Sequence, residues 1–351
     1  MSVTPVASAI MERAIETPAP ASPRPVPPQA PEPASPADPA PRRSSRASWV
    51  GAAVSVLALA GVVYWAVRQP APRLPQDAGE WLAVAGAVML YALATFVRGE
   101  RWQRLLVDEG GTPPRRVTHE LNVIGYMGNN LLPARAGDAI RVVLMTPRSG
   151  LLMRSVVGTL LAERLLDVGL LLVIFVIVGY GLLGEVGAGS VEYVLLAAAA
   201  VAAAAGVAYL LVRRNEKIMG FLAPIASATL GLRRAHHGLR LLGLTMVVWA
   251  IEAGVWMASA AAVGFGMTPI EGLYIVALAS IFAMIPSGPA YAGTQDAAAI
   301  IGIKALGATS AQAVAYVVML RFVIVVPITL AGLALLVTRY GGLGRLRAAR
   351  A

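Results

Sequence analysis

The stretch Gly125–Arg141 concentrates groups that could bind a charged ligand within an apolar chain. Its 17 residues include two Asn, two Arg, one Asp, three Gly and one Pro. Ionisable side chains at membrane depth are costly, so they usually face a bundle interior or an aqueous path. Pro133 and Gly137 interrupt a helix, and interrupted backbone is tolerated at that depth only where protein or a cavity covers it. The stretch therefore predicts the floor of a binding site.

Two arginines on either side of this break suggest anion binding. Residues Gly137–Asp138 are expected to begin the returning half-helix, whose free N–H groups and dipole favour an anion. Arg135 and Arg141 beside that helix N-terminus predict a phosphate site. The alternative is that Arg135 only extends to the headgroup layer at the membrane surface. Asn129 and Asn130 either hydrogen-bond a headgroup or satisfy backbone groups that the proline break leaves unpaired.

Acidic side chains also fall within predicted membrane helices. Glu163 and Asp167 are four residues apart and share one helix face, with Arg164 beside Glu163. The group forms either a neutralised ion network that holds helices together or a relay for protons or a headgroup, because buried ionisable groups in spans are functional candidates. Arg321 needs an acidic partner if it is buried. The candidates for that partner are Glu252, Asp296 and Glu163.

A second polar break follows the apolar run that ends at Ile285. Gly293 and Thr294 have the pattern of a break followed by a helix N-cap, which would place Gln295 and Asp296 in the first turn. Cys residues, a P-loop motif and a His-rich cluster are missing from the sequence, so no metal and no cofactor is predicted. Neutral polar side chains are expected to line this side of the site, namely Ser287, Tyr291, Thr294 and Gln295.

Composition indicates which elements must hold these residues. The chain has 351 residues, is 57% hydrophobic and 14% charged, and has a mean hydropathy of +0.69. Together with long uncharged runs, these values predict an all-α polytopic membrane protein. The net charge of +10 does not indicate nucleic-acid binding, because the Arg residues fall at the ends of apolar runs. Six full transmembrane helices are expected, at Trp49–Val67, Trp81–Val97, Ser155–Leu183, Tyr193–Val212, Leu241–Val263 and Ala311–Val337.

Two further pairs of apolar runs are too short to span. Val117–Leu132 has 16 residues and reaches about 24 Å, which is short of a hydrocarbon core of ~30 Å. Asp138–Met145 returns after the break, and Gly272–Ile285 and Thr294–Leu306 repeat the pattern. Each pair therefore predicts a re-entrant helical hairpin. Basic residues flank only the first pair, so the first hairpin is expected to enter from the cytoplasm and the second from outside.

The two hairpins predict an inverted repeat, with halves at about 80–183 and 241–337. Pro133 and Pro286 are 153 residues apart, and a shift by that distance places the second span near the fifth and the third near the last. Each half is then a span, a broken hairpin and a span. Paired interrupted segments of this kind point to a transport site at the repeat interface. Six spans place both termini in the cytoplasm.

The ends of the chain and of the second span have their own signals. Residues 1–47 are rich in Pro and Ala and are expected to form a disordered cytoplasmic tail, 48–340 a transmembrane domain, and 341–351 a basic cytoplasmic tail. Arg98 and Arg101 follow the second span and are typical of a cytoplasmic membrane surface. Trp102 is expected as an interface anchor there.

The run NNLLPARAGD at 129–138, followed by Arg141, resembles the signature of a known family. That family is the flippase-like membrane region of lysylphosphatidylglycerol synthases and their stand-alone relatives. Glu163–Asp167 (ERLLD) and Pro286–Asp296 resemble its other motifs in the same order, and the similarity covers most of residues 80–340. The resemblance implies the lipid-translocating half without the soluble aminoacyl-transferase domain. Relatives are linked to aminoacylated phosphatidylglycerol, polyprenyl-linked glycans and hopanoid systems.

These features favour a lipid translocator of a bacterial inner membrane, which would not be an enzyme. A polar cleft between the hairpins would carry a headgroup while the tails stay in the bilayer. Membrane lipids with anionic or polar headgroups are the expected partners, a lipid-synthesising enzyme is a further candidate, and nucleic acid is not expected. The alternative is a non-transporting scaffold or accessory subunit for a lipid-modifying or glycosyl-transfer enzyme. A translocator needs a lipid-accessible polar cavity that joins both hairpins, whereas a scaffold can pack them dry.

Overall fold

The structure, a computed structural model, describes seven ranges of the chain, and every regular element in them is helical, as predicted. The predicted span Tyr193–Val212 and most of Trp49–Val67 lie outside the described residues, as do residues 1–47, residues 342–351 and the predicted lining residue Ser287. The described ranges are 60–61, 63–64, 67–69, 72–132, 135–183, 235–283 and 289–341.

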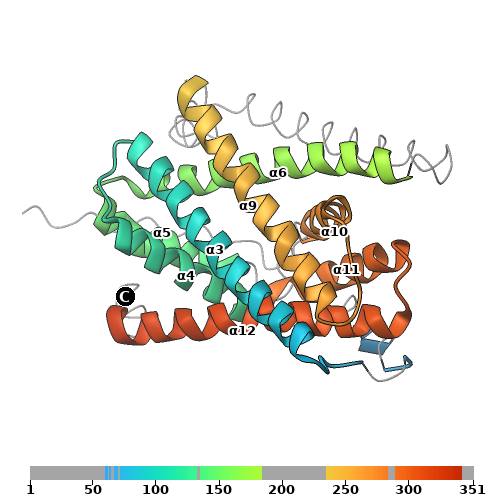
Figure 1. Cartoon of the computed structure of the whole chain (residues 1–351). Coiled ribbons are helices and arrows are strands. Elements are labelled where there is room, and N and C mark those ends of the chain that lie inside the picture. Colours follow the sequence, from blue (N-terminus) through green and yellow to red (C-terminus); the bar gives the residue numbers. More distant parts are fainter. Residues whose placement is uncertain are drawn as a thin grey trace, which may run out of the picture. The chain divides into compact units, whose positions relative to one another are not determined.

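Four long helices coincide with predicted spans (Figure 1). Three of them are long and apolar enough to cross a membrane: α3 (Ala78–Asp108), α9 (Ala235–Ala261) and α12 (Ser310–Tyr340). The fourth, α6 (Met153–Leu183), carries a charged cluster in its first half. The helix α3 extends well past its predicted end at Val97, and the total of six spans stays a prediction.

Short helices occupy both predicted hairpins. They have 17, 14, 14 and 12 residues, and at ~1.5 Å per residue each is shorter than a hydrocarbon core of ~30 Å. Within each hairpin the two helices pack against each other, and a short 3-10 turn, η3 (Pro289–Tyr291), belongs to the second break. The helices are α4 (Arg115–Leu131), α5 (Ala136–Ser149), α10 (Pro269–Phe282) and α11 (Thr294–Ala305).

The breaks contain strained backbone. Arg135, the N-cap of α5, adopts a left-handed conformation with φ 54°. Ala290 and Tyr291 do the same at the second break, with φ 53° and 57°. A left-handed conformation costs a residue with a side chain about 1–2 kcal/mol, so the surrounding contacts must hold these turns in place. Such strain clusters at functional sites, and both hairpin tips carry it.

The two hairpins open at opposite ends of α3. At the first hairpin, the Thr112 N–H, just after α3, donates to the Ser149 carbonyl at 3.0 Å. At the second, the side-chain amide of Gln312 donates to the Gly264 carbonyl at 3.4 Å, and Gly264 lies beside Arg73, just before α3. In each hairpin, the start of the first helix and the end of the second helix therefore lie close together. Whether the hairpins enter a membrane from opposite faces, and whether they form an inverted repeat, stay predictions.

A polar layer separates two hydrophobic clusters. One cluster contains residues of α9 to α12, and the other contains residues of α4, α5 and the neighbouring ends of α3, α6 and α12. On α3, Ala87 belongs to the first cluster and Trp102 to the second. Arg98 and Arg101 lie between them and are 8% and 0% exposed. The helix α6 carries its own charged cluster between Leu160 and Leu171, so charged groups meet in the middle of the fold.

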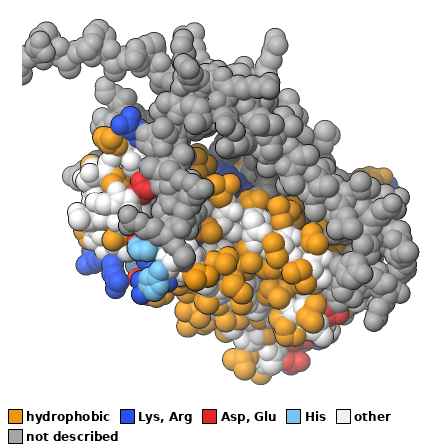
Figure 2. All heavy atoms as spheres, turned by 90° about the horizontal axis from the view of Figure 1, so that it is seen from above, with side chains coloured by type: hydrophobic (Ala, Val, Ile, Leu, Met, Phe, Trp, Pro, Cys, Tyr) orange, Lys and Arg blue, Asp and Glu red, His pale blue; other side chains and the backbone are white. Residues whose placement is uncertain are grey.

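The outer surface is largely apolar. In Figure 2 hydrophobic side chains cover a broad part of the described surface, while Lys, Arg and His side chains gather near one edge. On α9, the large side chains of Leu239, Leu242, Met246 and Val247 are exposed. Extended apolar surface of this kind marks a membrane or protein contact, and in helices of spanning length it indicates contact with lipid.

Close packing of α4 on α5 depends on glycine, and this gives a first testable prediction. A Cβ on Gly137 would collide with the Gly125 carbonyl oxygen and the Asn129 backbone nitrogen, whereas a Cβ on Gly169 of α6 meets nothing within 4 Å. Overpacking costs about 1–3 kcal/mol or more. We expect Gly137→Ala to lower the melting temperature of the purified protein in detergent and Gly169→Ala to leave it unchanged or slightly raised. Equal melting of the two variants would contradict the tight α4–α5 contact.

Candidate functional site

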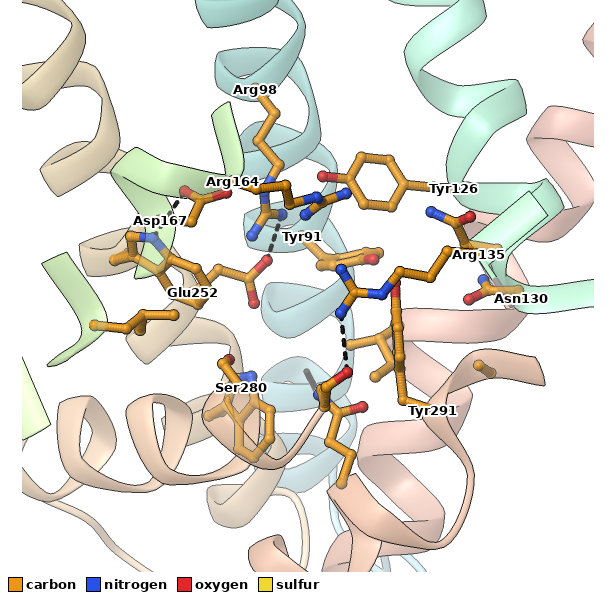
Figure 3. Close-up of a pocket in the computed structure, with 18 of the residues that line it drawn as sticks. Tyr91, Arg98, Tyr126, Asn130, Arg135, Arg164, Asp167, Glu252, Ser280 and Tyr291 are labelled. Atoms are coloured by element: carbon orange, nitrogen blue, oxygen red, sulfur yellow. Dashed lines mark hydrogen bonds and ion pairs between the residues drawn. The ribbon is translucent and has the colours of Figure 1, made fainter. Parts of the chain in front are cut away.

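A polar cavity of about 140 Å³ lies between the tips of the two hairpins (Figure 3). The volume is large enough for several water molecules, since one needs about 10–15 Å³ on this measure. Walls come from both hairpins and from α3, α6, α9 and α12. The lining residues are Tyr91, Arg98, Tyr126, Asn129, Asn130, Arg135, Arg164, Asp167, Val168, Leu171, Trp249, Glu252, Trp256, Ser280, Ala283, Ala290, Tyr291, Gln295 and Ile324.

One wall is a buried ion pair between α3 and α9. The Arg98 guanidinium lies 2.5 Å from the Glu252 carboxylate, and both side chains are less than a tenth exposed. Arg98 also lies 5.7 Å from the ring centres of Tyr126 and Trp249. Aromatic faces attract a guanidinium, so the pair is held in place from several sides. Glu252 was a predicted site residue, and its partner is Arg98 rather than Arg321.

A second ion pair joins α3 to α6. Arg101 contacts both oxygens of Asp167, at 2.6 and 3.0 Å, and reaches Glu163 at 3.5 Å. The indole N–H of Trp249 donates to Asp167 at 3.2 Å. Arg101 and Glu163 are almost completely buried. A buried charge needs this many partners, because desolvating it without them is very costly.

Arg141, which was predicted to share a phosphate site with Arg135, is not among the residues that line the cavity. It is 1% exposed, lies 4.0 Å from the centre of the Trp102 ring and pairs with Glu163 at 3.3 Å. Asp138 lies 3.7 Å from Arg141. Because α5 packs so closely on α4, the side chain of Arg141 is directed into the helix interface, where it pairs with the Glu163 carboxylate.

Arg164 continues the network to the rim of the cavity. It pairs with Asp138 at 3.2 Å, and the carboxamide of Asn129 donates to the same carboxylate at 3.3 Å. Arg164 therefore neutralises an acid on the first hairpin rather than its sequence neighbour Glu163. The amide of Asn130 donates to Thr329 at 3.1 Å, which ties the end of α4 to α12.

Arg135 connects the two hairpins. Its guanidinium donates to the carbonyl oxygen of Ala283, at the end of α10, at 2.9 Å. It also lies 4.9 Å from the centre of the Tyr291 ring. Figure 3 shows the side chain extended across the cavity toward the second hairpin. A backbone carbonyl is only a partial negative charge, so Arg135 retains the capacity to bind an anion.

A separate ion pair joins Asp296 of the second hairpin to Arg321 of α12. Arg321 lies 2.6 Å from Asp296 and also donates to the carbonyl oxygens of Ala290 and Tyr291. Asp296 is thus the partner of Arg321 among the three candidates. The expected N-cap at Thr294 is wrong: the N-cap is Gly293, whose N–H donates to Asp296 at 2.9 Å. The positive φ of 90° at Gly293 explains this, since glycine adopts such a turn readily.

The structure brings together some of the predicted site residues and separates others. Eight of them line the cavity: Asn129, Asn130, Arg135, Arg164, Asp167, Glu252, Tyr291 and Gln295. Asp138, Arg141 and Glu163 stand behind its wall in the ion network. Thr294, Asp296 and Arg321 do not line the cavity, and the last two form the ion pair that joins the second hairpin to α12.

Several cavity residues were not predicted from the sequence, most notably Arg98. The prediction of a basic surface end for α3 was wrong, because Arg98, Arg101 and Trp102 are buried. Trp102 donates from its indole N–H to Thr159 at 3.1 Å instead of anchoring at an interface. One signal could have revealed this arrangement. The predicted spans contain more acidic than basic residues, which indicates that an arginine outside those spans neutralises one of the buried acids. The other missed polar or aromatic lining residues are Tyr91, Tyr126, Trp249, Trp256 and Ser280.

Comparison with known families identifies the family of the chain. A family model described as the lysylphosphatidylglycerol synthase TM region matches residues 48–332. The chain belongs to this family. This match confirms the family that the sequence motifs indicated. The lysylphosphatidylglycerol synthase TM family is a membrane family related to lipid modification. The searches of curated proteins and of solved structures gave no match. Among the described residues, His, Asp and Glu side chains do not gather in a group that could hold a metal ion.

Proposed function

We propose that this protein is a lipid translocator that moves a polar-headed lipid between membrane leaflets, with the headgroup passing through the cavity between the hairpins. The observation that carries the proposal is the position of Arg135. It lies at a strained hairpin tip, lines a polar cavity and donates to a backbone carbonyl of the opposite hairpin. A scaffold has no need for a cavity that both hairpins line with charged side chains.

The charge balance around the cavity favours an anionic headgroup. In the described residues of the network, five guanidinium groups face four carboxylates, which leaves one net positive charge. A lipid phosphodiester carries one negative charge and would neutralise it. The guanidinium groups belong to Arg98, Arg101, Arg135, Arg141 and Arg164, and the carboxylates to Asp138, Glu163, Asp167 and Glu252.

Strained tips and buried pairs suggest how a headgroup could cross. Interrupted helices at the interface of two repeats commonly form the binding site of transporters, and motion of one repeat against the other exposes the site to each side. Here the hairpins open at opposite ends of α3 and meet at the cavity. We propose that they are re-entrant, enter from opposite faces and form an inverted repeat.

The same proposal covers the extent of the transmembrane domain, its topology, its location and its partners. The transmembrane domain would cover residues 48–340, with six spans and both termini in the cytoplasm of a bacterial cell whose inner membrane holds the protein. Residues 1–47 and 341–351 would be tails without a role in the cavity. The membrane lipid itself is the proposed partner, and an enzyme that synthesises it is a further candidate. The protein performs no chemistry on the lipid in this scheme.

The proposal is tested with purified protein reconstituted into liposomes. Lipids with a fluorescent acyl chain and different headgroups are added, and a membrane-impermeant quencher reports which leaflet holds them. We expect the protein to speed exchange of phosphatidylglycerol over protein-free liposomes, with less effect on a diacylglycerol that has no phosphate. Exchange no faster than in protein-free liposomes for every headgroup would contradict translocation and favour the scaffold alternative.

A further inference from the structure

A second hollow lies next to the polar cavity, and its chemistry is different. It has a volume of about 280 Å³, twice that of the polar cavity. Its lining comes from one face each of α3, α4 and α12. The lining residues are Val88, Tyr91, Ala92, Thr95, Phe96, His119, Val123, Pro327, Ile328 and Ala331. We call it the α3–α4–α12 groove.

The groove is suited to hydrocarbon. Its side chains are mostly aliphatic or aromatic. The imidazole of His119 is already engaged, because it stacks on Phe96 at 4.6 Å and lies 3.2 Å from Glu100. An apolar cavity of about 150 Å³ is large enough to bind benzene. The α3–α4–α12 groove therefore accommodates a longer hydrocarbon segment, and it presents no unpaired charge to it.

Small side chains create this space on the exposed surface of two candidate membrane spans. Ala92 and Ala331 line the groove and are exposed. They belong to α3 and α12, two of the helices with the length and composition of membrane spans. The neighbouring large side chains Leu93 and Leu330 are also exposed. An acyl chain in the bilayer can therefore reach the groove without crossing protein.

Tyr91 joins the groove to the polar cavity, because it lines both. Figure 3 shows it among the residues that line the polar cavity, which also include Arg98 and Arg135. Four residues further along the same face of α3, Thr95 also lines the groove. A molecule with an anionic end at Arg135 and a hydrocarbon end along α3 would thus meet matching surface at both ends.

We propose that the α3–α4–α12 groove binds one acyl chain of the same lipid whose phosphate binds in the polar cavity. The proposal rests on the proposed function for the identity of the headgroup site. It adds a second site of different chemistry and makes the ligand an amphiphile with at least one long hydrocarbon chain. Tyr91 marks the boundary between headgroup and chain.

The test uses phosphatidylglycerol with a photoreactive diazirine in one acyl chain, incorporated into nanodiscs with the purified protein. Irradiation followed by peptide mass spectrometry maps the labelled residues. We expect the groove residues of α3, α4 and α12 to be labelled several-fold more than the exposed surface of α9. Ala331→Phe fills the groove and should reduce its labelling several-fold. Ala334→Phe is the matched control, because Ala334 is exposed on α12 but does not line the groove.

A diazirine diacylglycerol with the same chains completes the design. If the chain is held together with its headgroup, this lipid labels the groove less than phosphatidylglycerol does. Equal labelling by both lipids, equal labelling of α9, or no effect of Ala331→Phe would each overturn the proposal. Labelling needs no movement between leaflets. Failure here with intact liposome exchange would therefore remove the acyl-chain site alone, whereas failed exchange with a specifically labelled groove would remove only translocation.

Discussion

Arg101→Met should cause the largest loss of stability of any single substitution at the cavity network. It leaves the Asp167 and Glu163 carboxylates buried with one cation fewer. Removing one partner of a buried ion pair costs about 3–5 kcal/mol, because the remaining charge is left without compensation. Arg101 also donates to Thr245 of α9 at 2.9 Å, so the loss loosens the contacts of α3 with both α6 and α9. We expect a large fall in the melting temperature in detergent and a reduced yield of monodisperse protein.

A surface ion pair supplies the control for this prediction. Arg116 lies 3.0 Å from Glu120, and its side chain is 65% exposed. Exposed pairs of this kind contribute about 0–1 kcal/mol, so Arg116→Met should melt close to the wild type. If Arg101→Met also melted close to the wild type, the network would not hold the three helices together, and its charges would be free for another role.

Arg135→Ala should have the largest effect on lipid movement with little effect on folding. The side chain is half-buried, and its hydrogen bond goes to a backbone carbonyl at a hairpin tip rather than to a carboxylate. Losing a charged hydrogen-bond partner of the phosphate costs about 1.5–3 kcal/mol, which corresponds to a fall of about ten- to a hundredfold in binding of the headgroup. Leaflet exchange of phosphatidylglycerol in liposomes measures the effect, and the melting temperature reports the fold. Unchanged exchange would place the headgroup elsewhere.

Helices and breaks were predictable because their signals are local. Apolar runs, charged ends and the Pro and Gly breaks predicted both pairs of short helices, and α5 and α11 begin within two residues of the predicted starts at Asp138 and Thr294. The first break needed a residue in the left-handed conformation, however, and a pattern of residue types did not identify Arg135 as that residue. Tertiary contacts decide which residue accepts such strain.

Pairing of charges was not predictable, because it depends on which helices pack. The sequence shows Arg98 and Arg101 at the end of an apolar run, which is also how a cytoplasmic surface looks. Only the packing of α3 on α6 and α9 places them opposite Glu252 and Asp167, which are more than 60 residues away in the chain. The same argument explains Arg141, since its burial follows from the glycine contact between α4 and α5.

The most direct test of the central claim is exchange of phosphatidylglycerol by the Arg135→Lys variant in liposomes. A lysine keeps the charge but loses the planar fork that can donate to a phosphate and to the Ala283 carbonyl together. The matched control is Arg116→Lys, which replaces an exposed arginine away from the cavity. If Arg135 binds the lipid phosphate, exchange falls several-fold in Arg135→Lys and stays at the wild-type rate in Arg116→Lys. An arginine that only extends to the headgroup layer would tolerate the swap, since lysine reaches that layer equally well. Wild-type exchange by the Arg135→Lys protein would therefore contradict the account.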